Sequence, residues 1–349
     1  MAAADPVSFR RGDSNGDGIR DLADPVHSLS FLFRGGAEPT CKKAADSNDD
    51  GTLDLSDAVY TLGYLFRGEA PPPAPFPGCG PDPTSDDLTC ESYAPCAQAL
   101  VYANLQIDAE ESDVAGLERL IALFKERSIF TTVYVSADYA NRNALLISDI
   151  YNQGFEVALH GYYTGEQLAT MTYEEQKDLL ERAKKAVEGC RPCGNFKPVV
   201  GFRPQYFSQN EDTYRVLDEL GLTHNSGFKV RQIFFAGHQW DEAPYKAPGH
   251  DFAAIPITTI PYGEDRIYLC DIACANTLKM TGAQWREVLM TGLNQSLEHR
   301  EPLVLLLHNW YTGDSEKYDY WQPLVDLLDA ATGKVVFVST QELVDRYVE

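Results

Sequence analysis

Residues 100–111 read Leu-Val-Tyr-Ala-Asn-Leu-Gln-Ile-Asp-Ala-Glu-Glu, a mainly apolar run that ends in acidic side chains. A run of this length, ended abruptly by charge, is typical of a buried β-strand. Residues 114–127 follow with apolar positions at helical spacing, which predicts an amphipathic helix directly after the strand. This strand–helix pair sets the pattern for the rest of the chain.

The same alternation continues to the C-terminus. Further strands are expected at residues 129–135, 156–159, 199–202, 253–260, 303–307 and 335–338, and further helices near residues 143–152 and 173–188. Strands and helices that alternate over about 250 residues predict an α/β fold whose parallel sheet closes, or nearly closes, into a (β/α) barrel. We therefore expect one α/β domain over residues 99–349, with its functional side chains where the strands end.

An internal repeat with a spacing of 33 residues occupies the N-terminal part of the chain. Residues 13–24, Asp-Ser-Asn-Gly-Asp-Gly-Ile-Arg-Asp-Leu-Ala-Asp, align with residues 46–57, Asp-Ser-Asn-Asp-Asp-Gly-Thr-Leu-Asp-Leu-Ser-Asp. Each copy continues into an apolar stretch that ends at Gly35 or Gly68, which predicts a loop followed by a short helix. The apolar side chains expected to be buried between the two helices are Leu29, Phe33, Leu62 and Phe66.

Both copies match the Asp-x-[Asp/Asn]-x-[Asp/Asn]-Gly pattern of a calcium-binding loop. Calcium prefers about six to eight oxygen ligands, which such a loop supplies around the sharp turn at its Gly. The ligand positions are Asp13, Asn15, Asp17, Ile19, Asp21 and Asp24 in the first copy, and Asp46, Asn48, Asp50, Thr52, Asp54 and Asp57 in the second. Ile19 and Thr52 would contribute backbone carbonyls. We expect two Ca²⁺ ions, one in each loop.

The charge balance excludes some classes of partner. Acidic residues outnumber basic residues 52 to 29, and the formal net charge is −23. Such a field repels phosphate backbones and anionic lipids, so we expect no nucleic-acid partner. No apolar stretch approaches the roughly 20 residues that a membrane-spanning helix needs, so we expect no membrane span.

The cysteines indicate the compartment. There are eight, and they fall into close groups, which is typical of structural disulfides in an exported protein. We therefore expect an extracellular protein, either secreted or held at the cell surface. The pairing does not follow from the sequence, although Cys90/Cys96 and Cys270/Cys274 could each close a short loop. The Pro- and Cys-rich residues 70–98 are expected to link residues 1–69 to residues 99–349.

Residues 9–69 resemble the duplicated dockerin module in their paired loops, their repeated helices and the Asp at position 12 of each loop. The resemblance implies a small all-α, EF-hand-like calcium module. Dockerins dock onto cohesin partners in extracellular complexes, so the implied partner is a cohesin-like protein. Self-association, and a purely stabilising role within this chain, are the alternatives.

Polar side chains follow several expected strands in a fixed order, as Asp108, His160, Arg203, Asp241 and His308. In this order they resemble the polysaccharide deacetylase family, which has the NodB-homology fold and is carbohydrate esterase family 4. The resemblance implies a NodB-type barrel that hydrolyses N- or O-acetyl groups on a polysaccharide or cell-wall glycan. It also implies a divalent metal, usually zinc.

The resemblance gives each of these residues a role. Asp108 matches the general base, and Arg203 matches the arginine that orients it. Asp241 matches the acidic partner of that arginine, and His308 matches the general acid. Tyr206 matches the residue whose backbone amide helps to form the oxyanion hole.

The metal positions depart from the family pattern. Ala109 stands where a second aspartate is expected and Thr164 where a second histidine is expected, which leaves His160. Alternation along a strand places Glu110 on the same face as Asp108, so a shifted zinc site with Glu110 and His160 can form. Two functions stay open. One is carbohydrate deacetylation, and the other is a catalytically silent structural or assembly protein of the cell exterior, held together through its calcium module.

Overall fold

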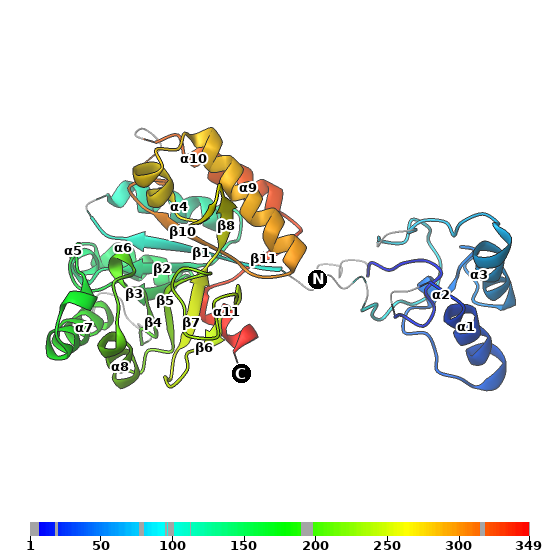
Figure 1. Ribbon diagram of the computed structural model, residues 1–349. Coiled ribbons are helices and arrows are strands. Elements are labelled where there is room, and N and C mark those ends of the chain that lie inside the picture. The colour runs from blue at the N-terminus through cyan, green and yellow to red at the C-terminus, as the bar shows by residue number, and fades with distance from the viewer. Residues whose placement is uncertain are drawn as a thin grey trace. The chain divides into compact units, whose positions relative to one another are not determined.

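The computed structural model describes residues 7–17, 20–76, 80–94, 96, 101–111, 113–189, 198–314 and 318–348. The chain divides into two compact units, residues 1–100 (the repeat unit) and residues 101–349 (the sheet unit), both drawn in Figure 1. Some residues singled out in the sequence lie outside the described residues, namely Ile19, Cys79, Cys190 and Cys193.

The repeat unit contains α1 (Ala23–Arg34), α2 (Lys42–Ala45) and α3 (Leu55–Arg67). Helices α1 and α3 are the second halves of the two sequence repeats and pack against each other (Figure 1). Gly35 and Gly68 end them in the left-handed conformation, with φ of 68° and 69°. The predicted loop–helix form of each repeat is therefore confirmed.

The faces that α1 and α3 bury differ from the prediction. Phe33 and Phe66 are each 66% exposed, so the prediction that they are buried is wrong, and Leu29 and Leu62 are half-buried. The buried positions of the two helices instead carry small or polar side chains, which allow a close approach of the helices. These are Asp24, Pro25 and Ser28 in α1, and Asp57, Ala58, Thr61 and Gly63 in α3.

Residues 71–76 and 80–94, expected as part of a linker, pack within the repeat unit. The backbone N–H of Phe9 donates to the carbonyl of Gly80 (3.0 Å), and Tyr93 is buried in a small core with Phe9. Cys41 and Cys90 form a disulfide, and Cys96 is also disulfide-bonded. The pairing of Cys90 with Cys96 is therefore wrong, because the chain brings Cys90 beside a residue 49 positions away.

In the described part of the sheet unit, nine strands form one sheet, in the order β10-β1-β2-β3-β4-β5-β7-β6, with β11 paired to β1. All neighbours are parallel except β6 and β7. The strands are β1 (Val101–Ala109), β2 (Thr132–Val135), β3 (Glu156–Leu159), β4 (Gly201–Phe202), β5 (His224–Lys229), β6 (Tyr245–Lys246), β7 (Ala253–Ile257), β10 (Leu303–His308) and β11 (Val335–Phe337). A separate hairpin pairs β8 (Thr259–Tyr262) with β9 (Asp265–Tyr268).

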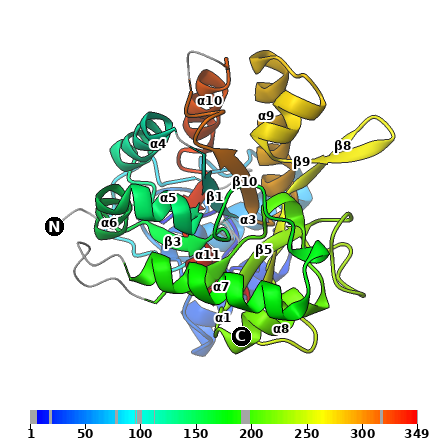
Figure 2. The ribbon, with the colours of Figure 1, turned by 90° about the vertical axis from the view of Figure 1, so that its left-hand side faces the viewer.

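Helices surround these strands, as Figure 2 shows. They are α4 (Val114–Glu126), α5 (Ala137–Arg142), α6 (Ala144–Asn152), α7 (Tyr173–Glu188), α8 (Glu211–Glu219), α9 (Gly282–His299), α10 (Trp321–Ala331) and α11 (Thr340–Tyr347). Their apolar sides and the strands form one large core, and β1 is buried almost throughout because it has β10 and β2 as neighbours and helices over its faces. No helix in the described ranges has the length and apolar character required to span a membrane.

The sheet curls but does not close into a barrel by a continuous ladder. Between β7 and β10 the strand pairing stops, and the gap is crossed by single hydrogen bonds near Thr258, such as its N–H to the carbonyl of Val304 (3.1 Å). The α/β part of the fold prediction is therefore confirmed, and where a closed or nearly closed barrel was expected, the described strands form a curled, open sheet. The curl still brings the carboxyl ends of the strands around one region.

Candidate functional site

The carboxyl ends of four parallel strands bring the predicted polar residues together. The register of β1 and β10 pairs Asp108 directly with His308. His160 and Arg203 each follow the last residue of β3 and β4, where Leu159 pairs with Phe202. The fold therefore gathers side chains that are 200 residues apart in the chain.

Asp108 lies at the centre of this group and is held by Arg203. Its Oδ1 forms an ion pair with Arg203 Nε at 2.9 Å, and both side chains are almost fully buried. Arg203 is itself fixed, because Nη1 donates to the carbonyl of Ser226 (3.1 Å) and Nη2 donates to Gln106 Oε1. The carboxylate of Asp108 is thus oriented by a cation that cannot move away.

His160 directs one ring nitrogen toward Asp108 and anchors the other. Its Nδ1 lies 2.9 Å from the carbonyl oxygen of Arg203, which can only accept, so Nδ1 carries a proton. Nε2 lies 3.4 Å from Asp108 Oδ2. A carbonyl that fixes the outer nitrogen of a histidine in this way is the usual support of a metal-binding imidazole.

Glu110 adds a buried oxygen with no partner. The residue is 9% exposed, and its Oε2 has no hydrogen-bond partner among the described residues. Burial raises the pKa of its carboxyl group. Two carboxylates and an imidazole are suitable donors for zinc, so the residues fit such an ion chemically. Their three ligand atoms are not yet gathered within 4.8 Å of one another, so Glu110 must turn inward to complete the set.

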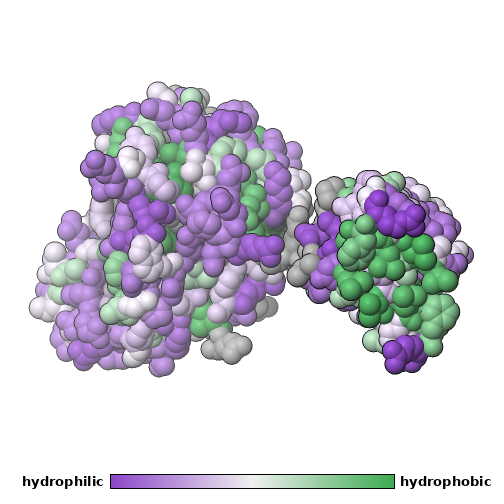
Figure 3. All heavy atoms as spheres, turned by 45° about the vertical axis from the view of Figure 1, so that its right-hand side comes forward, coloured by the Kyte–Doolittle hydropathy of each residue, from purple (hydrophilic) through white to green (hydrophobic). Residues whose placement is uncertain are grey.

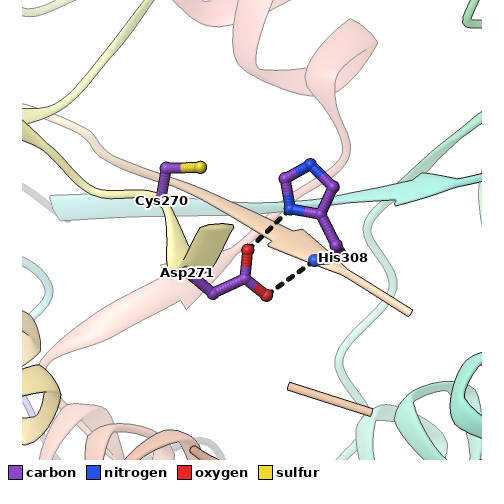
Figure 4. Close-up of side chains that lie close together, drawn as sticks. All are labelled: Cys270, Asp271 and His308. Atoms are coloured by element: carbon purple, nitrogen blue, oxygen red, sulfur yellow. Dashed lines mark hydrogen bonds and ion pairs between the residues drawn. The ribbon is translucent and has the colours of Figure 1, made fainter. Parts of the chain in front are cut away.

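His308 is held by a residue that the sequence analysis did not identify, Asp271. Its Nδ1 donates to Asp271 Oδ1 (2.6 Å) and its backbone N–H donates to Asp271 Oδ2 (2.8 Å), as Figure 4 shows. Burial lowers the pKa of His308, whereas the negative charges of Asp271 and of the more distant Asp108 and Glu110 raise it. The carboxylates have the larger effect, so the pKa of His308 is raised. The free Nε2 of His308 lies 3.8 Å from Asp108 Oδ2.

The structure does not place Asp241 beside Arg203. Its carboxylate lies 2.7 Å from His238 Nδ1, and among the described residues the ion-pair partner of Arg203 is Asp108. Asp271 follows the short strand β9, which the sequence analysis did not predict. The available signal was an acidic residue at the end of an apolar stretch, Ile-Tyr-Leu-Cys-Asp.

These side chains line a pocket of about 410 Å³. Its wall also carries aromatic residues, including Tyr206, Phe207, Tyr268 and Trp310. Tyr206 and Phe207 both have positive φ, 55° and 57°, a conformation that non-glycine residues rarely adopt in succession. This turn leaves the Tyr206 side chain 69% exposed at the pocket, which is suited to contact with a sugar ring.

Cys270 also lines the pocket, and its thiol is free. Cys274 is free as well, and both residues are buried, so the predicted pairing of Cys270 with Cys274 is wrong. Burial raises the pKa of both thiols, that of Cys274 to about 12. Each sulfur therefore behaves as a small apolar side chain.

The two acidic loops of the repeat unit have the same internal hydrogen bonds. The carboxylate at position 12, Asp24 or Asp57, accepts from the backbone N–H of Ser14 (2.9 Å) or Ser47 (2.8 Å). Its second oxygen accepts from the N–H of position 9, at 2.9 Å in both copies. The sequence repeat is thus a structural repeat, with its carboxylates turned into the loop.

The first and last carboxylates of each loop, Asp13 and Asp24 or Asp46 and Asp57, are buried close together. Burial first, and then the charge of Asp13, raises the pKa of Asp24 to about 7. In the second loop, burial together with the charge of Asp46 raises the pKa of Asp57 to about 7. A cation bound among these oxygens would offset the repulsion between the buried carboxylates. The all-oxygen donor set therefore fits calcium.

Comparisons with known proteins agree with the fold of the sheet unit. Residues 105–224 match the family model described as polysaccharide deacetylase. The curated proteins give no significant match. Structural likeness extends to a protein described as a polysaccharide deacetylase from Mycobacterium smegmatis (17% identity, 71% of this chain, 90% of that chain, TM-score 0.58). It extends also to a protein described as a polysaccharide deacetylase from Pseudomonas aeruginosa (17% identity, 71% of this chain, 91% of that chain, TM-score 0.59). Puue allantoinase is similar to the same degree (15% identity, 72% of this chain, 91% of that chain, TM-score 0.59).

Proposed function

We propose that the polysaccharide deacetylase-like sheet unit removes acetyl groups from a glycan by hydrolysis. The observation that carries the proposal is the pair of Asp108 and His308, which face each other at the pocket, each fixed by a buried partner of opposite charge. A base and an acid held at one site are what hydrolysis of an ester or amide requires. The family match and the fold agree with this activity.

The roles of the residues follow from their partners. Asp108, held by Arg203, accepts the proton of the attacking water. The raised pKa of His308 favours a proton on Nε2, which it donates to the leaving oxygen or nitrogen. Asp271 keeps Nδ1 of His308 protonated and the ring in place, as the third member of a catalytic triad does.

His160 and Glu110, with Asp108 beside them, are the residues that would hold a divalent metal. A zinc ion bound there would supply a Lewis acid for the acetyl carbonyl. His160 is ready for this role, because its Nδ1 is anchored to the carbonyl of Arg203. Glu110 supplies the buried oxygen that lacks a partner.

Acetate release from acetylated xylan and chitin oligosaccharides tests the proposal. The wild-type protein should release acetate, faster with added zinc, and Glu110→Ala should abolish the response to zinc. Glu118→Ala, a change in the same acidic residue type on helix α4, serves as the matched control. Release that is unaffected by chelators and by His160→Ala would contradict a metal role.

A silent sheet unit is the second candidate, and a specific observation favours it. Ala109 and Thr164 cannot supply the usual ligands, and no group of three ligand atoms that includes both Glu110 and His160 lies within 4.8 Å in the described chain. If no acetate is released with zinc, cobalt or manganese, and calorimetry detects no metal at His160, the structural role is the correct one.

For the repeat unit we propose calcium binding, one ion in each loop. The matching hydrogen bonds of the two loops and their buried carboxylates support it. Calorimetry on the full chain should find two sites, and Asp13→Ala and Asp46→Ala should each remove one. Asp87→Ala, a change outside the loops, should leave both sites. Absence of binding at millimolar calcium would contradict the proposal.

We also propose that the repeat unit docks a cohesin-like partner outside the cell. An apolar surface supports this, since three exposed residues of the first repeat recur 33 positions later in the second. They are Leu22, Val26 and Phe33, and Leu55, Val59 and Phe66. Figure 3 shows apolar side chains gathered on one face of this unit, and a patch of this kind is typical of an interaction site.

Cohesin modules titrated into the full chain test the docking proposal. Binding should require calcium and should be lost in the double variant Phe33→Ser, Phe66→Ser, whereas Tyr60→Ser in the same helix α3 serves as control. Concentration-dependent dimers in sedimentation, without cohesin binding, would show self-association instead and contradict the cohesin proposal. Export of the native chain into the culture medium would test the extracellular location.

A further inference from the structure

Lys229 is a cation in the pocket that the proposed reaction does not use. It is the last residue of β5, and its side chain lines the same pocket as Asp108 and His308. Its Nζ lies 4.2 Å from the ring centroid of Phe207 and 4.2 Å from that of Tyr268. The two rings meet edge to face at 5.5 Å, so they hold the ammonium group between them.

Within the part of the chain that the structure describes, this ammonium group has no carboxylate partner. Among the described residues, no carboxylate lies within ion-pair distance of Lys229 Nζ, although the chain has 52 acidic residues. Aromatic faces attract a cation, but they do not replace the hydrogen bonds that its three N–H groups made in water. Burial accordingly lowers the pKa of Lys229. A partly buried cation of this kind is stabilised when an anion enters the pocket.

The position of Lys229 relative to the reaction follows from its neighbours. Tyr268 is two residues before Cys270, and Cys270, Asp271 and His308 each offer a ligand atom within 4.8 Å of the others (Figure 4). Lys229 and Tyr268 therefore border the His308 side of the pocket. Under the proposed function, on which this step rests, His308 protonates the leaving group, so this side holds the deacetylated sugar.

We propose that Lys229 binds a carboxylate carried by the sugar next to the scissile acetyl group, which makes the substrate an acidic glycan. One ammonium group matches one carboxylate in charge. A phosphate monoester, which carries close to two negative charges, is a poorer match, because the other lysine or arginine in the described pocket lining is Arg203, which is already paired with Asp108. The flanking rings supply flat apolar surfaces for the sugar that carries the carboxylate.

Binding measurements on the full chain separate this proposal from the proposed reaction, because they need no turnover. The probes are a xylotetraose with one glucuronate branch and the disaccharide of N-acetylglucosamine and N-acetylmuramic acid, which carries a lactyl carboxylate. Each is compared with its neutral counterpart, xylotetraose and chitobiose. The variants are Lys229→Met, which retains the apolar stem, and Lys229→Arg, which retains the charge. Lys246→Met, an exposed lysine on β6, is the control.

The wild-type protein should bind at least one acidic probe about tenfold more tightly than its neutral counterpart, with a preference that falls as salt rises. Lys229→Met should remove the preference and leave neutral binding unchanged, and Lys229→Arg should keep part of it. The acidic probe that shows the preference identifies the source of the carboxylate. An equal loss of acidic and neutral binding in Lys229→Met, or no preference in the wild type, would overturn the proposal. Acidic binding without acetate release would support Lys229 and contradict only the deacetylase function.

Discussion

Asp271 accepts hydrogen bonds from the ring and backbone of His308 and from the hydroxyl of Thr312 (2.8 Å), although it belongs to none of the predicted motifs. We expect Asp271→Asn to lower kcat for acetate release about 100-fold with little change in KM, because His308 loses its orientation and its negative partner. Steady-state kinetics measure both constants. Asp326→Asn, at an exposed ion pair, is the control. A loss confined to KM would show that Asp271 acts in binding instead.

At the residue scale, the sequence predicted which side chains follow the strands, and the family resemblance paired two of them, Asp108 and Arg203. Asp108, His160, Arg203 and His308 come together because parallel strands end at one edge. The resemblance placed Arg203 beside Asp108, where the structure has it, but it also gave Arg203 a second acidic partner, Asp241, which the fold places beside His238 instead. Asp271 was missed because it follows a strand with a weak pattern, β9, in a different sheet.

Cys270 and Cys274 provide a chemical test of the local structure around the pocket. Alkylation of the unfolded, unreduced protein, followed by peptide mapping, should label both residues because both thiols are free. The same treatment should leave Cys41 and Cys90 unlabelled because they are joined. Protection of Cys270 together with labelling of Cys41 would contradict this arrangement.

Glu156 connects three elements, and its stability contribution depends on pH. Its carboxylate pairs with His224 of β5 (2.7 Å) and accepts from the backbone N–H of Gln341 in α11 (2.9 Å). Burial alone would raise the pKa of Glu156, but His224 and the hydrogen bonds outweigh it and the pKa is lowered. The ionised form therefore stabilises the fold above the unfolded-state pKa, and this stabilisation is lost as pH falls through the lowered value.

We expect Glu156→Gln to reduce the free energy of unfolding by about 2 kcal/mol at neutral pH. The difference from wild type should shrink in acid, because protonation removes the same charge from the wild-type side chain. Urea denaturation at neutral and acidic pH measures it, with the exposed Glu219→Gln as control. A difference that grows as the pH falls would contradict the assigned sign.

At the scale of elements, strong periodicity gave accurate bounds. The predicted strand at residues 156–159 and helix at residues 173–188 are confirmed as β3 and α7. Strand β5 was missed because His224–Lys229 carries polar residues that the fold buries through side-chain hydrogen bonds rather than through apolar packing. The edge between β7 and β10 is crossed by hydrogen bonds between Thr258 and Val304. The hydrophobic periodicity of the sequence does not indicate such bonds.

At the scale of the whole molecule, the chain has two compact units, and each candidate metal belongs to one of them. Calcium removal should therefore affect the repeat unit selectively, because its crowded carboxylates repel one another without a cation. Scanning calorimetry of the full chain with excess EGTA should lower or abolish one transition and leave the other in place. A uniform shift of both transitions, or none, would contradict separate calcium stabilisation of the repeat unit.

The two-unit organisation also explains which predictions from the sequence succeeded at this scale. The repeat and the strand–helix alternation are local patterns, so the α/β fold and the two loop–helix copies could be predicted. The packing of residues 80–94 against the repeats could not be predicted, because it depends on long-range contacts such as Arg11 with Asp82 (2.8 Å) and Cys41 with Cys90. The exposure of Phe33 and Phe66 could not be predicted either, because their apolar character alone indicated burial.

Acetate release by Asp108→Asn is the most direct test of the central claim, that the strand-end pocket is a hydrolytic site. The amide cannot accept the proton of water, so the variant should lose about 100-fold to 10,000-fold in rate on an acetylated oligosaccharide with zinc present. Its circular dichroism should match that of the wild type. Acetate release by Asp108→Asn at the wild-type rate would contradict the assigned base, and no release by the wild type with any divalent metal would contradict the hydrolytic site itself.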